Sequence, residues 1–244
     1  MLYVVSLGLH DENDISLRGI DALKKCKSIF IETYTSSIKI DFESLEKIAG
    51  NKIELLDRRG VEESGVILES AKSRDTAFIV PGDALSATTH HQVVFDARKA
   101  GIDVEIIHGS SIFSAIAETG LSLYKFGMTV SLPKPQENYF PESPYMNILA
   151  NKKRGLHTLI LLDIGMTAKE GIEILLELEK KVGKKLFTEK TKLVAVAHLG
   201  VKSTIKYGPI SELKKADFGA MPHTLILPGD MHFLEEDFVS QFAI

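Results

Sequence analysis

The sequence is poor in features that mark several protein classes. Its single cysteine, Cys26, excludes an intrachain disulfide and fits the reducing cytoplasm, where we expect this chain. The apolar start MLYVVSLGL is too short to span a membrane and lacks the basic residues of a signal peptide. No later apolar run is long enough for a membrane-spanning helix, so we expect no membrane segment.

Motifs for several kinds of chemistry are also missing. The formal net charge of -4 gives no basic footprint for nucleic acid, so we expect no nucleic-acid partner. The chain has neither a phosphate-binding G-x-x-x-x-G-K-[ST] loop nor a G-x-S-x-G nucleophile turn. No cysteine-rich metal pattern occurs, and the adjacent His90 and His91 would point about 100° apart on a helix. We therefore expect no metal site.

What the sequence does contain is a regular alternation of short apolar runs and amphipathic segments in both halves, which predicts α/β sheets. At 244 residues the chain is long enough for two small domains. We expect domains of residues 1–112 and 113–244. A proline-bearing segment from Leu132 to Tyr145 favours an alternative boundary near residue 132.

The most informative stretch runs from Ala77 to His91. Residues 77–80 form an apolar run typical of a buried parallel strand, and Pro81-Gly82-Asp83 ends it before a helix that closes at Gly101. Ligands of open α/β sheets bind at the carboxyl ends of strands. Gly82 would let a ligand approach the backbone, and Asp83 is either a hydrogen-bond acceptor for that ligand or a helix cap.

A second junction of the same kind follows the strand at 104–107. His108-Gly109-Ser110-Ser111 leads into a predicted helix from Ile112, and the two serines either cap this helix or donate to a ligand. Other residues at predicted strand boundaries are Leu9, Leu162, Leu199 and His223. Many of them are apolar, so this set suits a ligand held by backbone groups and apolar walls, such as adenine with ribose.

The turn Pro81-Gly82-Asp83-Ala84-Leu85-Ser86-Ala87-Thr88-Thr89-His90 resembles the diphthine synthase family of the tetrapyrrole methylase superfamily. The strings Ala87 to His90, Tyr124-Lys125-Phe126-Gly127 and Gly155-Leu156-His157-Thr158 are specific to that family, and the resemblance covers nearly the whole chain. Ala84 stands where the family usually has proline, and Ser6 stands where glycine often precedes Leu7. Gly or Ala commonly follows the histidine of the second junction, as Gly109 does here.

The resemblance implies two α/β domains of the tetrapyrrole methylase type, with S-adenosylmethionine in the cleft between them, and a homodimer. It implies that the substrate is translation elongation factor 2, whose aminocarboxypropyl-modified histidine receives three methyl groups on its amine. The implied cofactor contacts, by position, are Leu9, Asp83, Ser86, Ser111, Ile112, Leu162, Leu199 and His223. It names no catalytic residue, and Asp83 is one candidate for the group that removes the proton of the amine.

Two other functions compete with this one. A tetrapyrrole methylase acting on a precorrin would share the fold and the cofactor. A non-catalytic binding module for the translation factor would bind no S-adenosylmethionine.

Overall fold

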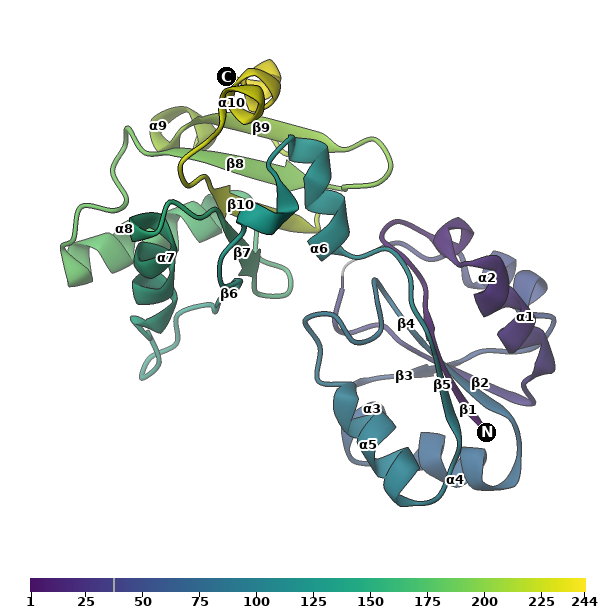
Figure 1. Ribbon diagram of the computed structural model, residues 1–244. Coiled ribbons are helices and arrows are strands. Elements are labelled where there is room, and N and C mark those ends of the chain that lie inside the picture. The colour runs from purple at the N-terminus through teal and green to yellow at the C-terminus, as the bar shows by residue number, and fades with distance from the viewer. Residues whose placement is uncertain (37) are drawn as a thin grey trace. The chain divides into compact units, whose positions relative to one another are not determined.

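The chain folds into two compact units, Met1–Phe113 and Ser114–Ile244, in a computed structural model that describes residues 1–36 and 38–244 (Figure 1). The division falls one residue beyond the boundary expected after residue 112. The alternative boundary near residue 132 is wrong, because Leu132 ends a strand inside the second sheet. The prolines there shape a connection within one unit.

The first unit contains a five-stranded parallel sheet with the strand order β3-β2-β4-β1-β5. Its strands are β1 (Leu2–Ser6), β2 (Ser28–Glu32), β3 (Glu54–Leu56), β4 (Thr76–Val80) and β5 (Val104–Ile107). The central strands β1 and β4 are buried along their whole length, as their continuous apolar runs predict.

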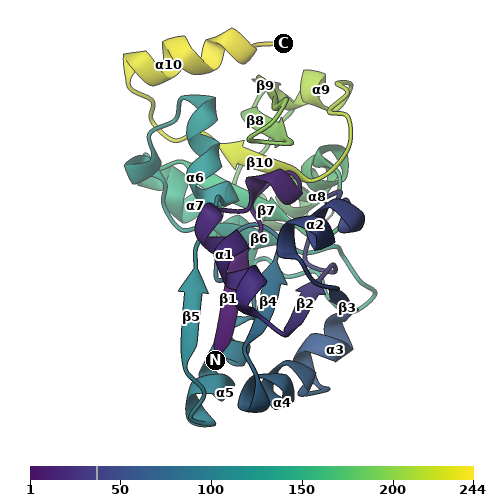
Figure 2. The same cartoon turned by 90° about the vertical axis from the view of Figure 1, so that its right-hand side faces the viewer.

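Helices cover both faces of this sheet (Figure 1). They are α1 (Leu17–Lys25), α2 (Phe42–Ala49), α3 (Arg58–Glu62), α4 (Val66–Ser73) and α5 (His91–Lys99). Alternate residues of β1 enter different cores: Tyr3 and Val5 pack in the cluster that holds α1 and α2, whereas Leu2 and Val4 pack with α3, α4 and α5. Figure 2 shows α1 and α2 in front of the sheet.

The connections that leave β1 and β4 run in opposite directions. The chain passes from β1 through α1 to β2, and from β4 through α5 to β5 on the other side of β1. Such a reversal between neighbouring strands is the topological switch point, where open α/β sheets bind their ligands.

The second unit contains a mixed sheet with the order β6-β7-β10-β8-β9. Its strands are β6 (Val130–Leu132), β7 (Thr158–Leu162), β8 (Lys192–Ala197), β9 (Thr204–Pro209) and β10 (His223–Leu227). Only β6 and β7 pair in parallel; β10 is antiparallel to β7 and β8, and β8 to β9. The helices are α6 (Ile112–Ala115), which begins before the division, α7 (Ser143–Lys153), α8 (Ala168–Val182), α9 (Ile210–Leu213) and α10 (Phe233–Val239).

From the sequence we also expect one helix over 62–73, a polar connection around Tyr207 and Gly208, a helix over 211–219, and the lysine clusters at 152–154 and 180–185 at helix ends. The structure corrects the first three. The segment around Tyr207 and Gly208, interpreted as a polar connection, is strand β9, because hydrogen bonds to β8 outweigh its weak apolar pattern. The helix expected over 62–73 begins only at Val66 as α4, because α3 ends at Glu62 and Gly65 adopts a left-handed conformation with φ 68°. The helix expected over 211–219 ends at Leu213.

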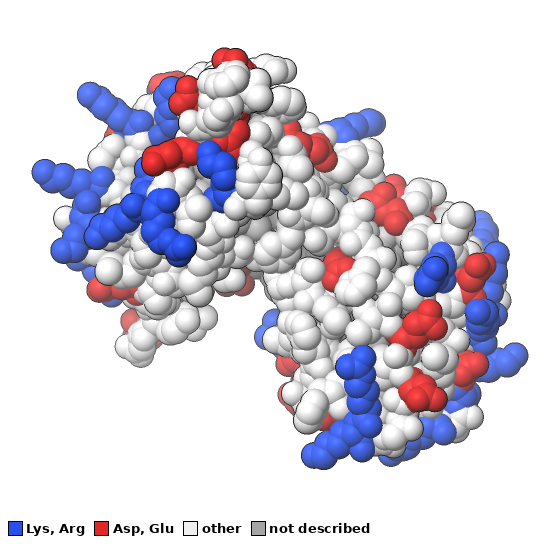
Figure 3. Space-filling view, viewed as in Figure 1, with Lys and Arg blue, Asp and Glu red and all other residues white. Residues whose placement is uncertain are grey.

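The lysine clusters at 152–154 and 180–185 lie at helix ends, as expected. Lys152 and Lys153 are in the last turn of α7, and Lys180 and Lys181 are in the last turn of α8. Figure 3 shows Lys and Arg side chains projecting over the region of these two helices. Positive charge there complements the negative end of each helix dipole.

Two of the family-specific strings meet at one buried carboxylate in the second unit. Glu235, which is 3% exposed, accepts hydrogen bonds from Ser122 N at 2.8 Å, His232 N at 2.8 Å and His157 Nε2 at 3.1 Å, and Lys125 Nζ binds it as well. Lys125 and His157 of these strings therefore belong to the scaffold of the second unit.

The charge state of this cluster follows from its bonds. His157 Nδ1 accepts from Gly229 N at 2.8 Å, so Nε2 carries the proton of the neutral ring. Burial lowers the pKa of His157. For Glu235, burial opposes ionisation, but the bonds from Lys125, His232, Ser122 and His157 outweigh it and hold the carboxyl pKa well below its usual range.

Both shifts make the fold less stable in acid. Each group binds fewer protons when folded than when unfolded, so the free energy of unfolding falls as pH drops. The contribution of His157 is lost as pH falls below about 6.5, and that of Glu235 below about 4.3.

We expect Glu235→Gln to cost about 2–4 kcal/mol at pH 7 and to flatten the acid limb of the stability curve. Urea unfolding at several pH values measures both effects.

The matched control is the exposed neighbour Glu236. Glu236→Gln should leave stability and its pH dependence unchanged. Equal behaviour of the two variants would show that the buried cluster does not stabilise this unit.

Candidate active site

Three loops leave the carboxyl edge of the first sheet side by side. They follow β1, β4 and β5, and β1 pairs with both of the other strands. Gly8 and Gly82 join two of these loops through a pair of backbone hydrogen bonds, with Gly82 N donating to Gly8 O at 2.6 Å and Gly8 N donating to Gly82 O at 3.1 Å. This bridge lies at the switch point.

Asp83 joins the loops after β4 and β5. Its Oδ1 accepts from Leu85 N at 3.1 Å and Ser86 Oγ at 3.0 Å. Its Oδ2 accepts from His108 Nδ1 at 2.8 Å and Gly109 N at 3.2 Å. A carboxylate offers about four acceptor positions. Asp83 is therefore both a local cap and a link between two strand ends, and a ligand hydroxyl would have to share its oxygens.

Asp83 stays ionised in this setting. The residue is 8% exposed, and burial alone would raise the pKa of its carboxyl group. The hydrogen bonds from His108, Leu85, Gly109 and Ser86 outweigh this effect, so the pKa of Asp83 is lowered.

The two departures from the family pattern compensate each other. Ser6 Oγ accepts a hydrogen bond from Ala84 N at 2.9 Å, and both residues are buried. Glycine at position 6 would offer no side-chain acceptor, and proline at position 84 would need none. Ser6 also explains Gly109, because a Cβ at position 109 would lie 2.8 Å from Ser6 Cβ.

This pairing predicts strong coupling between two substitutions. Ser6→Gly alone leaves the buried Ala84 N–H without its acceptor, and Ala84→Pro alone drives the proline ring against Ser6 Oγ. We expect each single change to cost about 1–3 kcal/mol. The double variant, which has the family's usual residues, should recover most of that loss. Urea unfolding of all four chains measures the coupling, and additive losses would contradict it.

The other expected contacts of the first unit lie at the same edge. Leu9 N donates to Asp14 Oδ2 at 3.0 Å, which holds the loop after β1. The hydroxyl of Ser86 donates to Asp83 Oδ1, and Ser111 immediately precedes Ile112, the first residue of α6. The backbone at Gly82 is accessible, since its φ is 71° and a Cβ there would meet nothing within 4 Å.

The three expected contacts of the second unit also share one edge. Leu162 is the last residue of β7, Leu199 follows β8, and His223 is the first residue of β10. The antiparallel register places His223 opposite Ala197 and Thr224 opposite Leu161, so the three contacts meet at one end of the second sheet.

Both ring nitrogens of His223 form hydrogen bonds with the backbone. Its Nδ1 accepts from Ala168 N, the first residue of α8, at 3.1 Å, and Nε2 donates to Ala220 O at 3.0 Å. Burial lowers the pKa of His223, so the ring is neutral. Any cofactor contact here must use the backbone or a ring carbon, while the nitrogens hold the start of α8.

Glu32 is among the residues that carry the family resemblance but not among the expected contacts; it ends β2 and is fully buried. Its Oε2 accepts from Tyr34 N at 2.8 Å and Thr35 N at 3.0 Å, and Thr35 Oγ1 donates to Oε1. An acid at the end of an apolar strand was the available signal. Glu32 fixes the backbone at Tyr34 and Thr35.

A separate cavity of about 400 Å³ lies between α3, α4 and α5. Ile67, Thr89, His90 and Val93 are among its lining residues, and none of the eight expected contacts is. Both ring nitrogens of His90 are hydrogen-bonded, Nδ1 with Thr88 Oγ1 at 2.6 Å and Nε2 with Tyr34 Oη at 3.3 Å.

Within residues 1–36 and 38–244, no cluster of His, Cys, Asp or Glu is arranged to hold a metal ion, and no helix could cross a membrane.

Comparison with known proteins assigns the fold to a family. The family of Tetrapyrrole (Corrin/Porphyrin) Methylases matches residues 1–214. Diphthine synthase of Methanocaldococcus jannaschii is 46% identical, over 97% of this chain and 96% of the relative. The chain belongs to the diphthine synthase family of tetrapyrrole methylases.

Further relatives agree. Diphthine synthase of Methanococcus aeolicus is 43% identical over 97% of this chain and 96% of its own length. A solved diphthine synthase structure covers 99% of this chain and 95% of its own, with 31% identity and a TM-score of 0.89. A structure from Entamoeba histolytica, provisionally assigned as diphthine synthase, matches 100% of this chain and 98% of its own length, with 38% identity and a TM-score of 0.94.

Membership makes the chain an S-adenosylmethionine-dependent methyltransferase of diphthamide biosynthesis. The first sheet fits this cofactor, because the backbone at Gly82 is open at the switch point and the neighbouring Leu9 and Pro81 are apolar. The resemblance in sequence, the two-unit α/β fold and the cofactor class are thereby confirmed.

The cofactor contacts themselves remain a prediction with a direct test. Asp83→Ala removes the link between the loops after β4 and β5, and we expect a loss of roughly 1.5–3 kcal/mol in binding of S-adenosylmethionine. Calorimetric titration of the folded variant measures it. The control is Asp75→Ala, at the opposite end of β4, where an exposed carboxylate pairs with the N-terminus at 3.3 Å. Unchanged affinity in Asp83→Ala would remove Asp83 from the site.

Proposed function

We propose that this methyltransferase acts on the aminocarboxypropyl-modified histidine of translation elongation factor 2. The amine of that group receives three methyls, which gives diphthine. The observation that carries the proposal is the 46% identity to an archaeal diphthine synthase along almost the whole of both chains.

The cofactor would be held by the eight contacts that the family resemblance implies, at the edges of both sheets. Those of the first unit lie beside Gly8 and Gly82, and those of the second lie at the ends of β7, β8 and β10. When bound, S-adenosylmethionine supplies a methyl group on a sulfonium, which is already a good leaving group. The chain's own task is then to orient the amine, exclude water and accept its proton.

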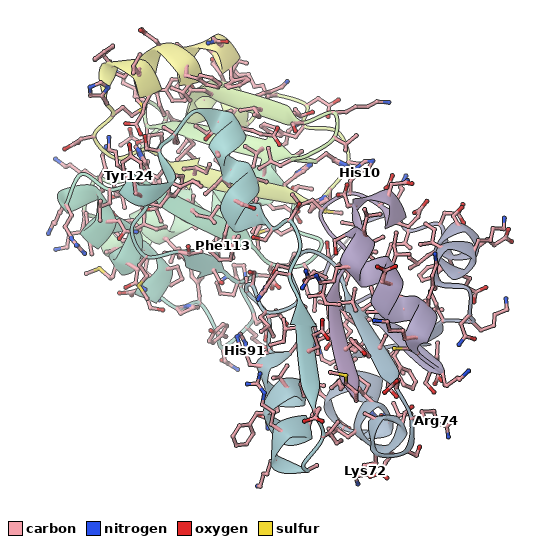
Figure 4. All side chains as sticks on the ribbon, turned by 45° about the vertical axis from the view of Figure 1, so that its right-hand side comes forward. His10, Lys72, Arg74, His91, Phe113 and Tyr124 are labelled. Carbon is pink, nitrogen blue, oxygen red and sulfur yellow. The ribbon has the colours of Figure 1, made fainter. Side chains whose placement is uncertain are left out.

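Two exposed tyrosines of the second unit support a protein as the acceptor. Tyr124 is 89% exposed and is labelled in Figure 4, and Tyr139 is 52% exposed. The neighbouring Phe140 is packed instead, with Lys181 Nζ 5.4 Å from its ring centroid. The tyrosines could contact the loop of the factor that carries the modified histidine, whereas Lys125 and Phe126 belong to the scaffold.

The decisive assay mixes the chain with S-adenosylmethionine and elongation factor 2 that bears the aminocarboxypropyl histidine. A mass gain of three methyl groups on that one residue is the expected result. Factor with an unmodified histidine is the control and should gain none. No gain on the modified factor, with turnover on a precorrin, would identify a tetrapyrrole methylase. Absence of cofactor binding would favour the non-catalytic module.

We also propose that the chain works as a homodimer in the cytoplasm. Closed two-fold pairs are the commonest soluble oligomers, and the family resemblance implies one. Light scattering should give about twice the 26.9 kDa mass of the chain at micromolar concentration. A monomer mass would reject the dimer without affecting the proposed reaction.

A further inference from the structure

His108 stands at the cofactor edge, directly beside Asp83. Its Nδ1 lies 2.8 Å from Asp83 Oδ2. An ionised carboxylate can only accept hydrogen bonds, so Nδ1 must carry the proton of this contact. In the neutral ring, the lone pair is then on Nε2.

The two partners differ sharply in exposure. The side chain of His108 is 68% exposed, whereas that of Asp83 is 8% exposed. A buried, anchored acid thus fixes the tautomer and orientation of a largely exposed ring. A carboxylate that orients a histidine in this way is the arrangement found in acid–base catalysis.

The buried histidines of the chain contrast with His108. His90, His157 and His223 each have both ring nitrogens hydrogen-bonded within the protein. Their lone pairs and protons are committed to the fold. His108 is engaged by Asp83 at one nitrogen, in the loop that carries the expected cofactor contacts Ser111 and Ile112.

We propose that His108 is the catalytic proton acceptor of this methyltransferase and that Asp83 is the residue that positions it. The proposal rests on the proposed function, because it requires an amine as the methyl acceptor.

The chemistry requires one proton to leave before each transfer. An ammonium nitrogen has no lone pair, so it must first lose a proton, and His108 Nε2 takes it to form an imidazolium that passes it to water. The amine lone pair then forms the N–C bond while the C–S bond of the cofactor breaks and leaves its electron pair on sulfur. Three methylations release three such protons, and the final quaternary nitrogen has none to give.

Asp83 is poorly suited to this role itself. Four donors occupy its oxygens, and their hydrogen bonds lower its pKa and make it a weak base. The titratable groups on the loop after β1 are His10, Asp11, Glu12 and Asp14. The Asp14 carboxylate accepts from Leu9 N and His10 N at 3.0 and 2.9 Å.

The test replaces the base but keeps the bond to Asp83. In His108→Asn the side-chain amide can still donate to Asp83 Oδ2, yet it cannot accept a proton near neutral pH. With the modified elongation factor 2, we expect the single-turnover rate to fall by about 100- to 10,000-fold. Calorimetric Kd for S-adenosylmethionine should change by less than about threefold. His91→Asn, which removes an exposed histidine at the start of α5, should leave both values unchanged.

Two readouts separate catalysis from a structural role. Added imidazole should restore part of the rate in His108→Ala, with the restored rate rising as the imidazole becomes neutral. Nitrogen-15 spectra of the parent chain without cofactor should show the proton of neutral His108 on Nδ1.

The inference is overturned by a near-parental rate in His108→Asn, by a rate loss matched by an equal loss of cofactor affinity, or by a proton on Nε2 of the neutral ring. Failure of the proposed function looks different, because the parent chain itself would then leave the modified factor unmethylated.

Discussion

The hydrogen bonds of Asp83 are the constraint on which the first unit's site depends. Parallel strands end in separate loops, and nothing in a sheet ladder fixes those loops relative to one another. Here one buried carboxylate takes four donors from the loops after β4 and β5, and the Gly8–Gly82 bridge adds the loop after β1. The result is a preorganised edge at the switch point of the sheet, and a ligand that binds there need not order three loops.

The second unit uses buried polar groups in the same way. Glu235 ties together segments that are more than 100 residues apart in sequence, and His223 joins the start of β10 to the start of α8. The hydrogen bonds of Glu235 and His223 hold separate segments of this unit together. The family-specific strings of this unit are therefore explained mainly by its architecture, with Tyr124 as the exposed exception.

Much of the first unit could be predicted from sequence, because buried parallel strands appear as continuous apolar runs and glycines mark their ends. Strand β9 was missed because it is an edge strand whose hydrogen bonds to β8, rather than its composition, define it. Six of the eight contacts that the family resemblance implies lie at or near strand ends, where the sequence predicted strand boundaries. The roles of individual side chains could not be predicted. Asp83 links the loops after β4 and β5, and His223 accepts a hydrogen bond from the first residue of α8. The hydrogen bond between Ser6 and Ala84 joins residues 78 positions apart, so only the fold reveals it.

The central claim is that the edge held by Asp83 is where the cofactor binds. A crystal structure of the chain with S-adenosylhomocysteine tests it most directly. We predict the product at the carboxyl ends of β1, β4 and β5, against the backbone of Gly82, with the bonds from Asp83 to His108 and Gly109 intact. Product bound instead in the cavity between α3, α4 and α5, or an Asp83 that releases His108 to bind it, would contradict this account.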